Sequence, residues 1–334
     1  MPANLTPEYK KAEAAYKRAR DPQERLELLG EMHRAIPKHK GTEHLRAEIK
    51  TKIKELRAEL AAPTKGGART GPATYIHPDG AAQVAIIGPP NTGKSSIHAG
   101  LTGSHTHVGA YPFTTQYPEP GMLTVDDAHL QLVDLPPISP EHPLPWIGNT
   151  LQSADGALLV IDLSQPGCVE ALIVLREDLE TKHVTLVESW DPAHTDHDDP
   201  FAVVVPTLMI VNKRELIDDV EGELAVCREL ADVHFPFLAV SAATGEGMEA
   251  IGPWLFRNLG IVRVYTKVPG KEPDMGRPYT VRHGATVGDV AVMVHRDLAS
   301  DFHHARIWGS DAYDGQQVGK DHVVEDGDIL EIHV

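Results

Sequence analysis

Short apolar runs, each followed at once by glycine or a polar residue, recur through the middle of the chain. The runs cover residues 83–87, 130–133, 157–161, 207–211 and 237–240, and the residues that follow them are Gly88, Asp134, Asp162, Asn212 and Ser241. Runs of this length are typical of strands buried on both faces, and patterns typical of helices separate several of them, at 95–101, 169–179 and 248–259. The alternation predicts a doubly wound, mostly parallel α/β sheet with its ligand site along the carboxyl edge. One strand pair interrupts it, because residues 122–125 and 130–133 flank Asp126-Asp127 as in a hairpin.

The first 62 residues carry helical signals instead. Thr6 and Asp21 each precede a proline, the arrangement of an N-cap followed by proline at the first helical position. A later helix has one apolar stripe with spacings of 4, 4, 3 and 4, formed by Leu45, Ile49, Ile53, Leu56 and Leu60. The stripe is only about two heptads long. We therefore expect a helical hairpin that packs on itself or on the next domain, in preference to a coiled-coil dimer.

The last part of the chain changes character again. Strand-like segments at 261–266, 279–282, 305–308, 316–318 and 329–333 surround one helix, expected at 287–295 with Thr286 as its cap. One helix on a small mixed sheet predicts a compact α+β module. Glycine and proline are frequent at 61–75, which is typical of a linker. The predicted parts are a helical region (1–65), a glycine-rich linker (66–80), the α/β domain (81–260) and the α+β module (261–334).

Composition excludes several classes of protein. The apolar runs are too short to cross a membrane, and no apolar signal-peptide core is found near residue 1, so we expect a soluble cytoplasmic protein. Two cysteines, Cys168 and Cys227, are too few to staple 334 residues. The net charge is −17, yet residues 1–65 hold 15 lysines and arginines against 10 acidic residues. An acidic body argues against broad non-specific nucleic-acid binding, and we expect no DNA partner. On charge alone the basic N-terminal arm is expected to be a solvated helical face, although it could still contact phosphate locally.

Histidines occur in two groups. His194 and His197 lie among acidic residues at 194–199, where a solvated acidic insertion is the expected structure and a metal site the alternative. The histidines of the last module, for instance His304 and His333, lack the cysteine spacing of a zinc site. We interpret them as surface or interface residues.

The stretch after the first apolar run carries the strongest chemical signal. It reads Gly88, Pro89, Pro90, Asn91, Thr92, Gly93, Lys94, Ser95, Ser96, and so fits the P-loop pattern G-x-x-x-x-G-K-[ST] between a strand and a helix. Such a loop points backbone N–H groups inward at phosphate oxygens. Lys94 adds a positive charge for the β- and γ-phosphates, and the Ser95 hydroxyl suits Mg²⁺. The following helix directs the positive end of its dipole at the same anion.

Residues at the other strand ends narrow the nucleotide class. Asp134 follows a strand at the place where a P-loop protein holds Mg²⁺. Asn212, Lys213 and Glu215 follow a later strand, where a carboxylate can accept two hydrogen bonds from guanine and the lysine stem can lie along the base. Residues Ser241, Ala242 and Ala243 follow the last strand and could offer a backbone N–H to guanine O6. This order of motifs indicates a GTPase, with GTP or GDP and Mg²⁺ as ligands.

With these motifs in place, the chain resembles the Obg/DRG family of translation-factor-class GTPases. Segments 264–267, 283–287, 307–309 and 321–323 resemble the TGS domain of the DRG branch, and the helix and linker after residue 46 resemble the helical region of that branch. The resemblance covers nearly the whole chain. It implies a P-loop NTPase fold, a β-grasp fold for the TGS module, and a role at the ribosome or on structured RNA, with a regulatory protein partner as a further expectation.

The family pattern also assigns residues. Thr115 falls at the Mg²⁺ ligand of switch I, with Thr114 beside it, and Asn91 falls at the P-loop asparagine that binds K⁺ in related GTPases. Ile138 stands where Ras-like GTPases carry a catalytic glutamine, and the family that the chain resembles has an apolar residue at this place. The resemblance therefore implies slow hydrolysis in which Lys94, Asn91 and Thr115 act together with Mg²⁺ and K⁺.

Two departures from the family pattern keep alternatives open. Pro137 replaces the switch II glycine whose N–H reaches the γ-phosphate, and proline has no N–H. Glu215 replaces the aspartate that reads the base, so the carboxylate lies one methylene further out. We expect a slow GTPase acting as a ribosome-associated or RNA-associated switch. A nucleotide-loaded scaffold with little hydrolysis and an ATP-using relative are the alternatives.

Overall fold

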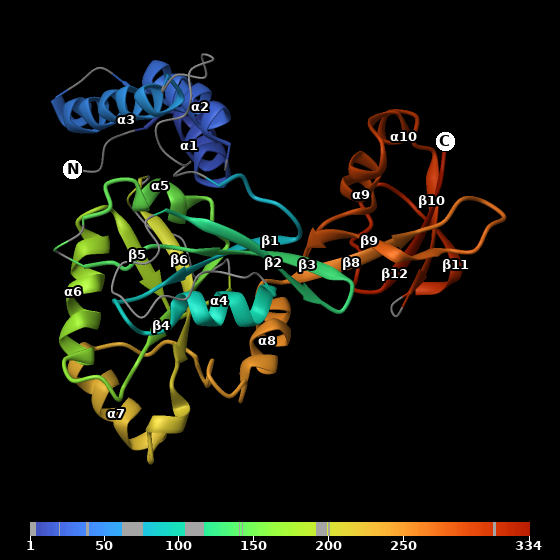
Figure 1. Cartoon of the computed structure of the whole chain (residues 1–334). Helices are drawn as coiled ribbons and strands as arrows, with labels where there is room; N and C mark the ends of the chain where they lie inside the picture. Colours follow the sequence, from blue (N-terminus) through green and yellow to red (C-terminus); the bar gives the residue numbers. More distant parts are fainter. Residues whose placement is uncertain are drawn as a thin grey trace, which may run out of the picture.

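The computed structural model describes most of the chain. The described residues are 5–19, 21–37, 40–61, 76–103, 117–139, 141, 143–191, 199, 201–309 and 312–334. Three bodies follow one another along the chain in Figure 1: a group of helices, a large α/β body, and a smaller module at the C-terminal end.

The α/β body is built on a sheet with the strand order β2-β3-β1-β4-β6-β5, and β7 pairs with β6 as well. Neighbouring strands are parallel except for β2 and β3. The strands are β1 (Ala82–Ile87), β2 (Glu119–Val125), β3 (Ala128–Asp134), β4 (Gly156–Ile161), β5 (Val184–Val187), β6 (Val203–Val211) and β7 (Phe237–Ala239). Register places Asp134 beside Ile86 and Ile161 beside Val211. The polar residues after these strands therefore meet at one edge, as predicted.

Helices cover both faces of this sheet, and the alternation of side chains along β1 shows how. Ala85 and Ile87 point into a core with α5, α6 and α7, while Val84 and Ile86 point into a second core with α4 and α8. The helices are α4 (Lys94–Thr102), α5 (Ile147–Gln152), α6 (Cys168–Glu180), α7 (Val220–Ala231) and α8 (Ile251–Asn258). The predicted doubly wound architecture is confirmed.

The predicted helix at 248–259 is divided in two. It begins as a turn of 3₁₀ helix (Met248–Ala250) and continues as α8. Both predicted strands of the hairpin around Asp126-Asp127 are present, and Asp126 adopts a positive φ of 53° in the turn.

Three α-helices precede the sheet in the part of the chain that the structure describes: α1 (Pro7–Arg18), α2 (Pro22–Ala35) and α3 (Glu43–Ala61). The predicted caps are present, because Thr6 accepts a hydrogen bond from the Tyr9 N–H and Asp21 accepts from the first turn of α2. Tyr9, Leu29, Met32 and Ile49 form a fully buried core, joined by Phe201 from the α/β body. The ring of Phe201 meets that of Tyr16 edge to face, 6.1 Å between centroids. The helices thus pack on one another and on the next domain.

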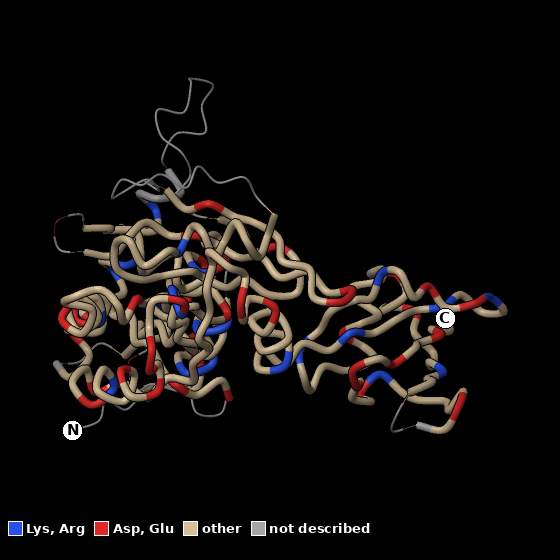
Figure 2. Tube along the Cα trace, turned by 60° about the horizontal axis from the view of Figure 1, so that its bottom comes forward, with Lys and Arg blue, Asp and Glu red and all other residues tan. Residues whose placement is uncertain are grey.

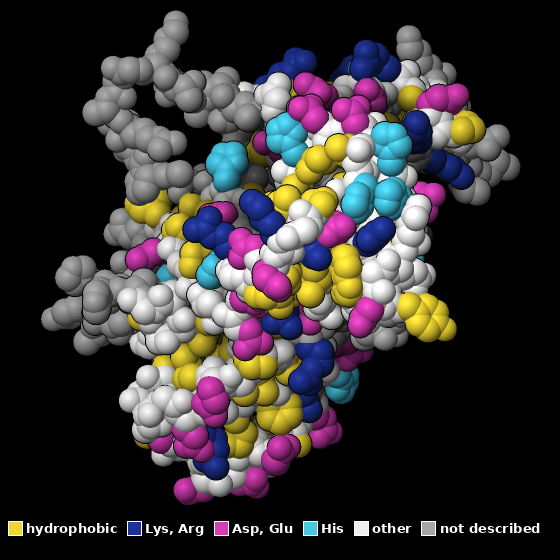
Figure 3. Space-filling model, turned by 90° about the vertical axis from the view of Figure 1, so that its right-hand side faces the viewer, with side chains coloured by type: hydrophobic (Ala, Val, Ile, Leu, Met, Phe, Trp, Pro, Cys, Tyr) yellow, Lys and Arg dark blue, Asp and Glu magenta, His cyan; other side chains and the backbone are white. Residues whose placement is uncertain are grey.

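The C-terminal module has a five-stranded sheet with the order β11-β10-β12-β8-β9 and α9 packed on one face. Its elements are β8 (Ile261–Thr266), β9 (Asp274–Arg282), α9 (Val287–Val294), α10 (Arg296–Ser300), β10 (His304–Gly309), β11 (Ala312–Val318) and β12 (Asp328–His333). Thr286 and Asp289 form the capping box of α9. Histidines gather near the top of the face in Figure 3, and the rings of His304 and His333 stack with centroids 4.5 Å apart.

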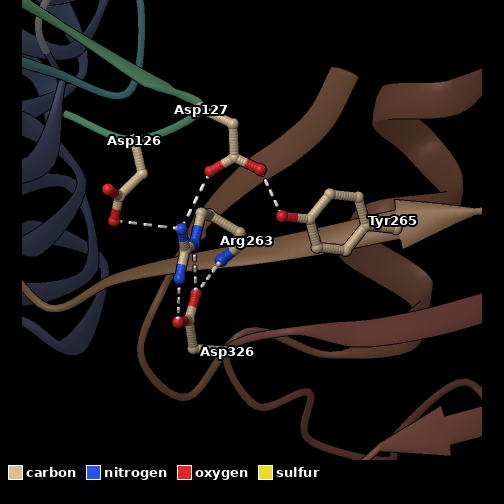
Figure 4. A network of polar contacts seen from close by, with 5 residues as sticks. All are labelled: Asp126, Asp127, Arg263, Tyr265 and Asp326. Carbon is tan, nitrogen blue, oxygen red and sulfur yellow. Dashed lines mark hydrogen bonds and ion pairs between the residues drawn. The ribbon is translucent and has the colours of Figure 1, made fainter. Parts of the chain in front are cut away.

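Arg263 of β8 joins this module to the α/β body (Figure 4). Its guanidinium donates to Asp127 in the β2–β3 turn and to Asp326 before β12, each at 2.8 Å, and stacks over the Phe256 ring of α8 at 4.9 Å. Tyr265 also donates to Asp127. Asp127 lies directly before the start of β3, so the module is attached at the amino edge of the large sheet, opposite the carboxyl edge.

Acidic residues are spread over all three bodies in Figure 2. Across the described parts of the chain, no helix combines the length and the apolar character that crossing a membrane requires. Both cysteines are free thiols.

Candidate nucleotide-binding site

The loop between β1 and α4 is wrapped tightly, and two glycines make this possible. Gly88 has φ 151°, and a Cβ at this position would lie 2.3 Å from the carbonyl oxygen of Val160. Gly93 has φ 91°, and a Cβ there would lie 2.2 Å from the amide nitrogen of Asn212. Asn91 between them has a positive φ of 63°. Side chains other than hydrogen do not fit at the two glycine positions, so the loop keeps the curled path that a phosphate cradle needs.

Lys94 begins α4 and turns back into the loop. Its side chain is buried, and Nζ donates to the carbonyl oxygen of Pro89 at 2.9 Å. Burial lowers the pKa of the Lys94 ammonium to about 8, although the charge of Asp134 partly opposes the shift. The loop thus encloses one cation among backbone groups, which is an environment suited to a phosphate.

Ser95 and Asp134 meet beside the lysine. The Ser95 hydroxyl donates to Oδ2 of Asp134 at 2.6 Å, and the Asp134 carboxylate is fully buried. Burial raises the pKa of Asp134, whereas the hydrogen bond from Ser95 and the charge of Lys94 lower it. A hydroxyl and a carboxylate oxygen are ligands that Mg²⁺ prefers. The residues present therefore fit a magnesium ion next to the phosphate cradle.

Asn212 ties the phosphate end of the site to the end expected for the base. Its amide donates to the carbonyl oxygen of Thr92 at 2.8 Å, and its carbonyl accepts from the Ala242 N–H at 3.0 Å. Asn212 and Ser241 are buried, and the Ser241 hydroxyl accepts the N–H of Thr244. The side chain of Asn212 thus fixes two loops relative to each other, a structural role that its position after a strand did not reveal.

Lys213 and Glu215 follow Asn212 but point to different partners. Lys213 has φ 60°, and its Nζ pairs with Asp162 at 2.7 Å. Asp162 also accepts hydrogen bonds from the N–H and hydroxyl of Ser164. Glu215 lies exposed in the 3₁₀ turn Arg214–Leu216. Asp162 ends a predicted strand, which is a signal that could have marked it as a residue of the site.

The segment after Asp134 is held close to the loop. The Leu135 N–H donates to Ile86, and the Ile138 N–H donates to the Gly88 carbonyl at 3.3 Å. Pro137 is buried between them. The expected switch I residues Thr114 and Thr115 lie outside the described residues, as do His194 and His197. Among the residues that the structure describes, no group of three or more His, Cys, Asp or Glu side chains could hold a metal ion.

Comparisons with known proteins agree with this geometry. The family model described as "50S ribosome-binding GTPase" matches residues 83–194, and the TGS domain model matches residues 262–334. A GTP-binding protein of Methanocaldococcus jannaschii, itself uncharacterised, is 29% identical over 93% of this chain and 92% of its own length. Developmentally-regulated GTP-binding protein 2 of Mus musculus is 27% identical over 92% of this chain and 98% of its own length.

A solved structure supports the fold. The YchF GTPase of Schizosaccharomyces pombe aligns with a TM-score of 0.51 at 15% identity, covering 78% of this chain and all of that one. Two domain matches and relatives along most of the sequence thus agree with the phosphate loop and strand ends described above. The chain thus carries a GTPase domain and a C-terminal TGS domain, and along most of its length it is similar to developmentally-regulated GTP-binding proteins.

Proposed function

We propose that the protein is a slow, Mg²⁺-dependent GTPase that acts as a switch on the ribosome or on structured RNA. The observation that carries the enzymatic part is the grouping of Lys94 inside the loop with the Ser95–Asp134 pair at the same sheet edge. GTP would replace the Pro89 carbonyl as the partner of Lys94, and Ser95 and Asp134 would hold Mg²⁺, Asp134 through water. In this proposal Gly88–Ser96 as a whole lines the phosphates.

Guanine is the base that we propose. The Ala242 N–H already serves Asn212, so the next amide, that of Ala243, is the donor that we assign to guanine O6. The exposed Glu215 carboxylate would accept the two base N–H groups, and the stem of Lys213 would lie along the ring. Adenine offers a donor where guanine has O6, so an ATP-using protein is the alternative that this arrangement disfavours.

Hydrolysis would be slow because of two residues in switch II. Ile138 cannot orient water as a glutamine does, and Pro137 cannot donate an N–H to the γ-phosphate. We propose that Asn91 holds K⁺ beside the phosphates and that Thr115 completes the Mg²⁺ ligands. Pro137 also supports the second candidate, a nucleotide-loaded scaffold that works through its other domains with little hydrolysis.

The partner is proposed from the domains and the charge distribution. The GTPase family model is described as ribosome-binding, and residues 1–65 are basic while the rest of the chain is acidic.

We propose a cytoplasmic location. The proposed domains are a helical region at 1–65, a linker at 66–80, a GTPase domain at 81–260 and a TGS domain at 261–334. A regulatory protein partner belongs to the same proposal.

Multiple-turnover phosphate release from GTP tests the enzymatic proposal. The wild type in Mg²⁺ and K⁺ should exceed a Lys94→Ala variant, and replacing K⁺ by Na⁺ should slow it. If the wild type is no faster than Lys94→Ala yet still binds GTP, the scaffold is the correct function and the GTPase proposal fails.

A further inference from the structure

We infer that the groove between α2 and α3 binds the phosphate backbone of RNA. This inference rests on the proposed RNA-linked function and gives it a defined contact site. The groove has a volume of about 390 Å³ and is lined by His33 of α2 and by Lys50, Ile53, Lys54 and Arg57 of α3.

The three cations of α3 form a straight row along the groove. Lys50, Lys54 and Arg57 follow one another at i, i+4 and i+7, so they share one helix face, and all three are exposed. The row spans about 10 Å along the helix axis, since each residue advances about 1.5 Å. The row is longer than one phosphate group, so successive phosphates of a nucleic-acid strand can engage its three cations together. A single free phosphate would engage only part of it.

The row has no evident structural purpose. Within the described residues, no acidic side chain pairs with Lys50, Lys54 or Arg57, although like charges at i, i+4 destabilise a helix. A cation in the core of the helical region does have a structural partner. The Arg25 guanidinium stacks over the Tyr16 ring, 4.8 Å from its centroid. The cations of the groove are therefore available to an anionic ligand.

The charge of the whole chain favours approach from this side. Residues 1–65 have a net charge of +5, from 15 basic and 10 acidic residues. The remainder has 16 basic and 38 acidic residues, a net charge of −22. An RNA strand is repelled by the acidic body and attracted by the helical region, so the groove also orients the ligand. Contacts of this kind hold the backbone and do not read sequence.

Binding of a fluorescently labelled RNA hairpin to the full-length protein, over a salt series, tests the inference. The variant carries Lys50→Gln, Lys54→Gln and Arg57→Gln together. Counterion release predicts about five- to eightfold weaker binding per lost contact near 0.1 M salt, on the order of 100-fold or more for three, and a salt slope smaller by about 2 to 3. A variant with Lys50→Arg and Lys54→Arg keeps the charges and should bind like the wild type.

A matched control separates the groove from total charge. Lys10, Lys11 and Arg18 are exposed cations of α1 outside the groove, and their change to glutamine removes the same charge. This control should bind RNA within about threefold of the wild type. Equal weakening of both triple variants, or none in either, overturns the groove assignment.

The failures of the two proposals can be told apart. If the wild type binds no RNA hairpin, both the groove and the RNA partner of the proposed function are wrong. If the wild type binds and the groove variant is unchanged, only the groove is wrong. GTP binding and phosphate release should be the same in all these proteins, because none of the changed residues belongs to the proposed nucleotide site.

Discussion

Replacing Arg263 by methionine should loosen the junction between the TGS domain and the GTPase domain. Methionine keeps an apolar stem over Phe256 but removes the guanidinium that bridges Asp127 and Asp326. The side chains of Arg263, Asp127 and Asp326 are 20%, 25% and 38% exposed. The contact therefore lies between surface ion pairs, worth about 0–1 kcal/mol, and buried pairs whose disruption costs about 3–5 kcal/mol. We expect a loss of about 2 kcal/mol.

Hydrogen exchange is the suitable assay, because unfolding of a multidomain chain is not a single transition. The Arg263 amide donates to Asp326, and the Gly327 amide donates to the Arg263 carbonyl, so both amides report opening on the module side of the junction, where the turn before β12 contacts Arg263. A loss of about 2 kcal/mol corresponds to about 30-fold faster exchange. Arg277→Met is the matched control, since Arg277 is an exposed arginine of β9. Exchange in Arg263→Met that stays within about threefold of this control would refute the reasoning.

The same junction should depend on pH. The hydrogen bond from Arg263 holds the pKa of Asp326 below its usual range, and in Asp127 the hydrogen bonds from Tyr265 and Arg263 outweigh burial and lower the pKa as well. The stabilisation is complete above the unfolded pKa of about 4 and is lost as the pH falls through the lower folded values. The difference in exchange between the wild type and Arg263→Met should therefore shrink in acid. An unchanged difference would contradict this assignment of charges.

Four further predictions concern the nucleotide site. Lys94→Ala should weaken GDP binding about 100-fold by calorimetry. Since burial lowers the Lys94 pKa to about 8, GDP binding to the wild type above that pH should take up a proton, which titrations in buffers of different ionisation enthalpy would detect. Pro137→Gly restores an N–H and should speed phosphate release about tenfold or more, and an unchanged rate would show that Pro137 does not cause the slow turnover that we propose. Glu215→Asp should tighten GDP binding about tenfold without improving ATP binding, whereas a parallel gain for ATP would exclude Glu215 as the base reader.

The large sheet could be predicted because most of its strands have a clear pattern in the sequence. Fully buried parallel strands are continuous apolar runs, and β1, β4 and the second half of β6 have that form. The first half of β6 was not predicted, because Pro206 interrupts the pattern at the point where pairing passes from β5 to β7. Short, partly buried elements such as β5 give little periodic signal.

Helix α7 shows why an amphipathic pattern can fail to indicate a helix. Leu224 and Cys227 are buried, but Val226 and Leu230 on the opposite side are 54% and 63% exposed. Apolar residues on both faces hide the stripe that a prediction needs. Strand β9 begins at Asp274, five residues before the predicted start, because Gly276 and Pro278 are not typical of strands.

The candidate site was predicted where one local motif defines it and was incomplete where distant residues meet. The spacing from Gly88 to Ser95 identifies the loop without a structure. The hydrogen bond from the Asn212 amide to the Thr92 carbonyl joins residues 120 positions apart, and no local sequence pattern predicts it. The same is true of Arg263 and Asp127, which only the folded chain brings together.

The central claim is that the site around Lys94 and Glu215 selects guanine nucleotides. Calorimetric titration of nucleotide-free protein with GDP, GTP and ATP, each with Mg²⁺ and K⁺, tests it most directly. We predict that GDP and GTP bind and that ATP does not, with the GDP-to-GTP affinity ratio near one because Pro137 cannot sense the γ-phosphate. ATP binding as tight as that of GTP, or no binding of any of the three, would contradict the account.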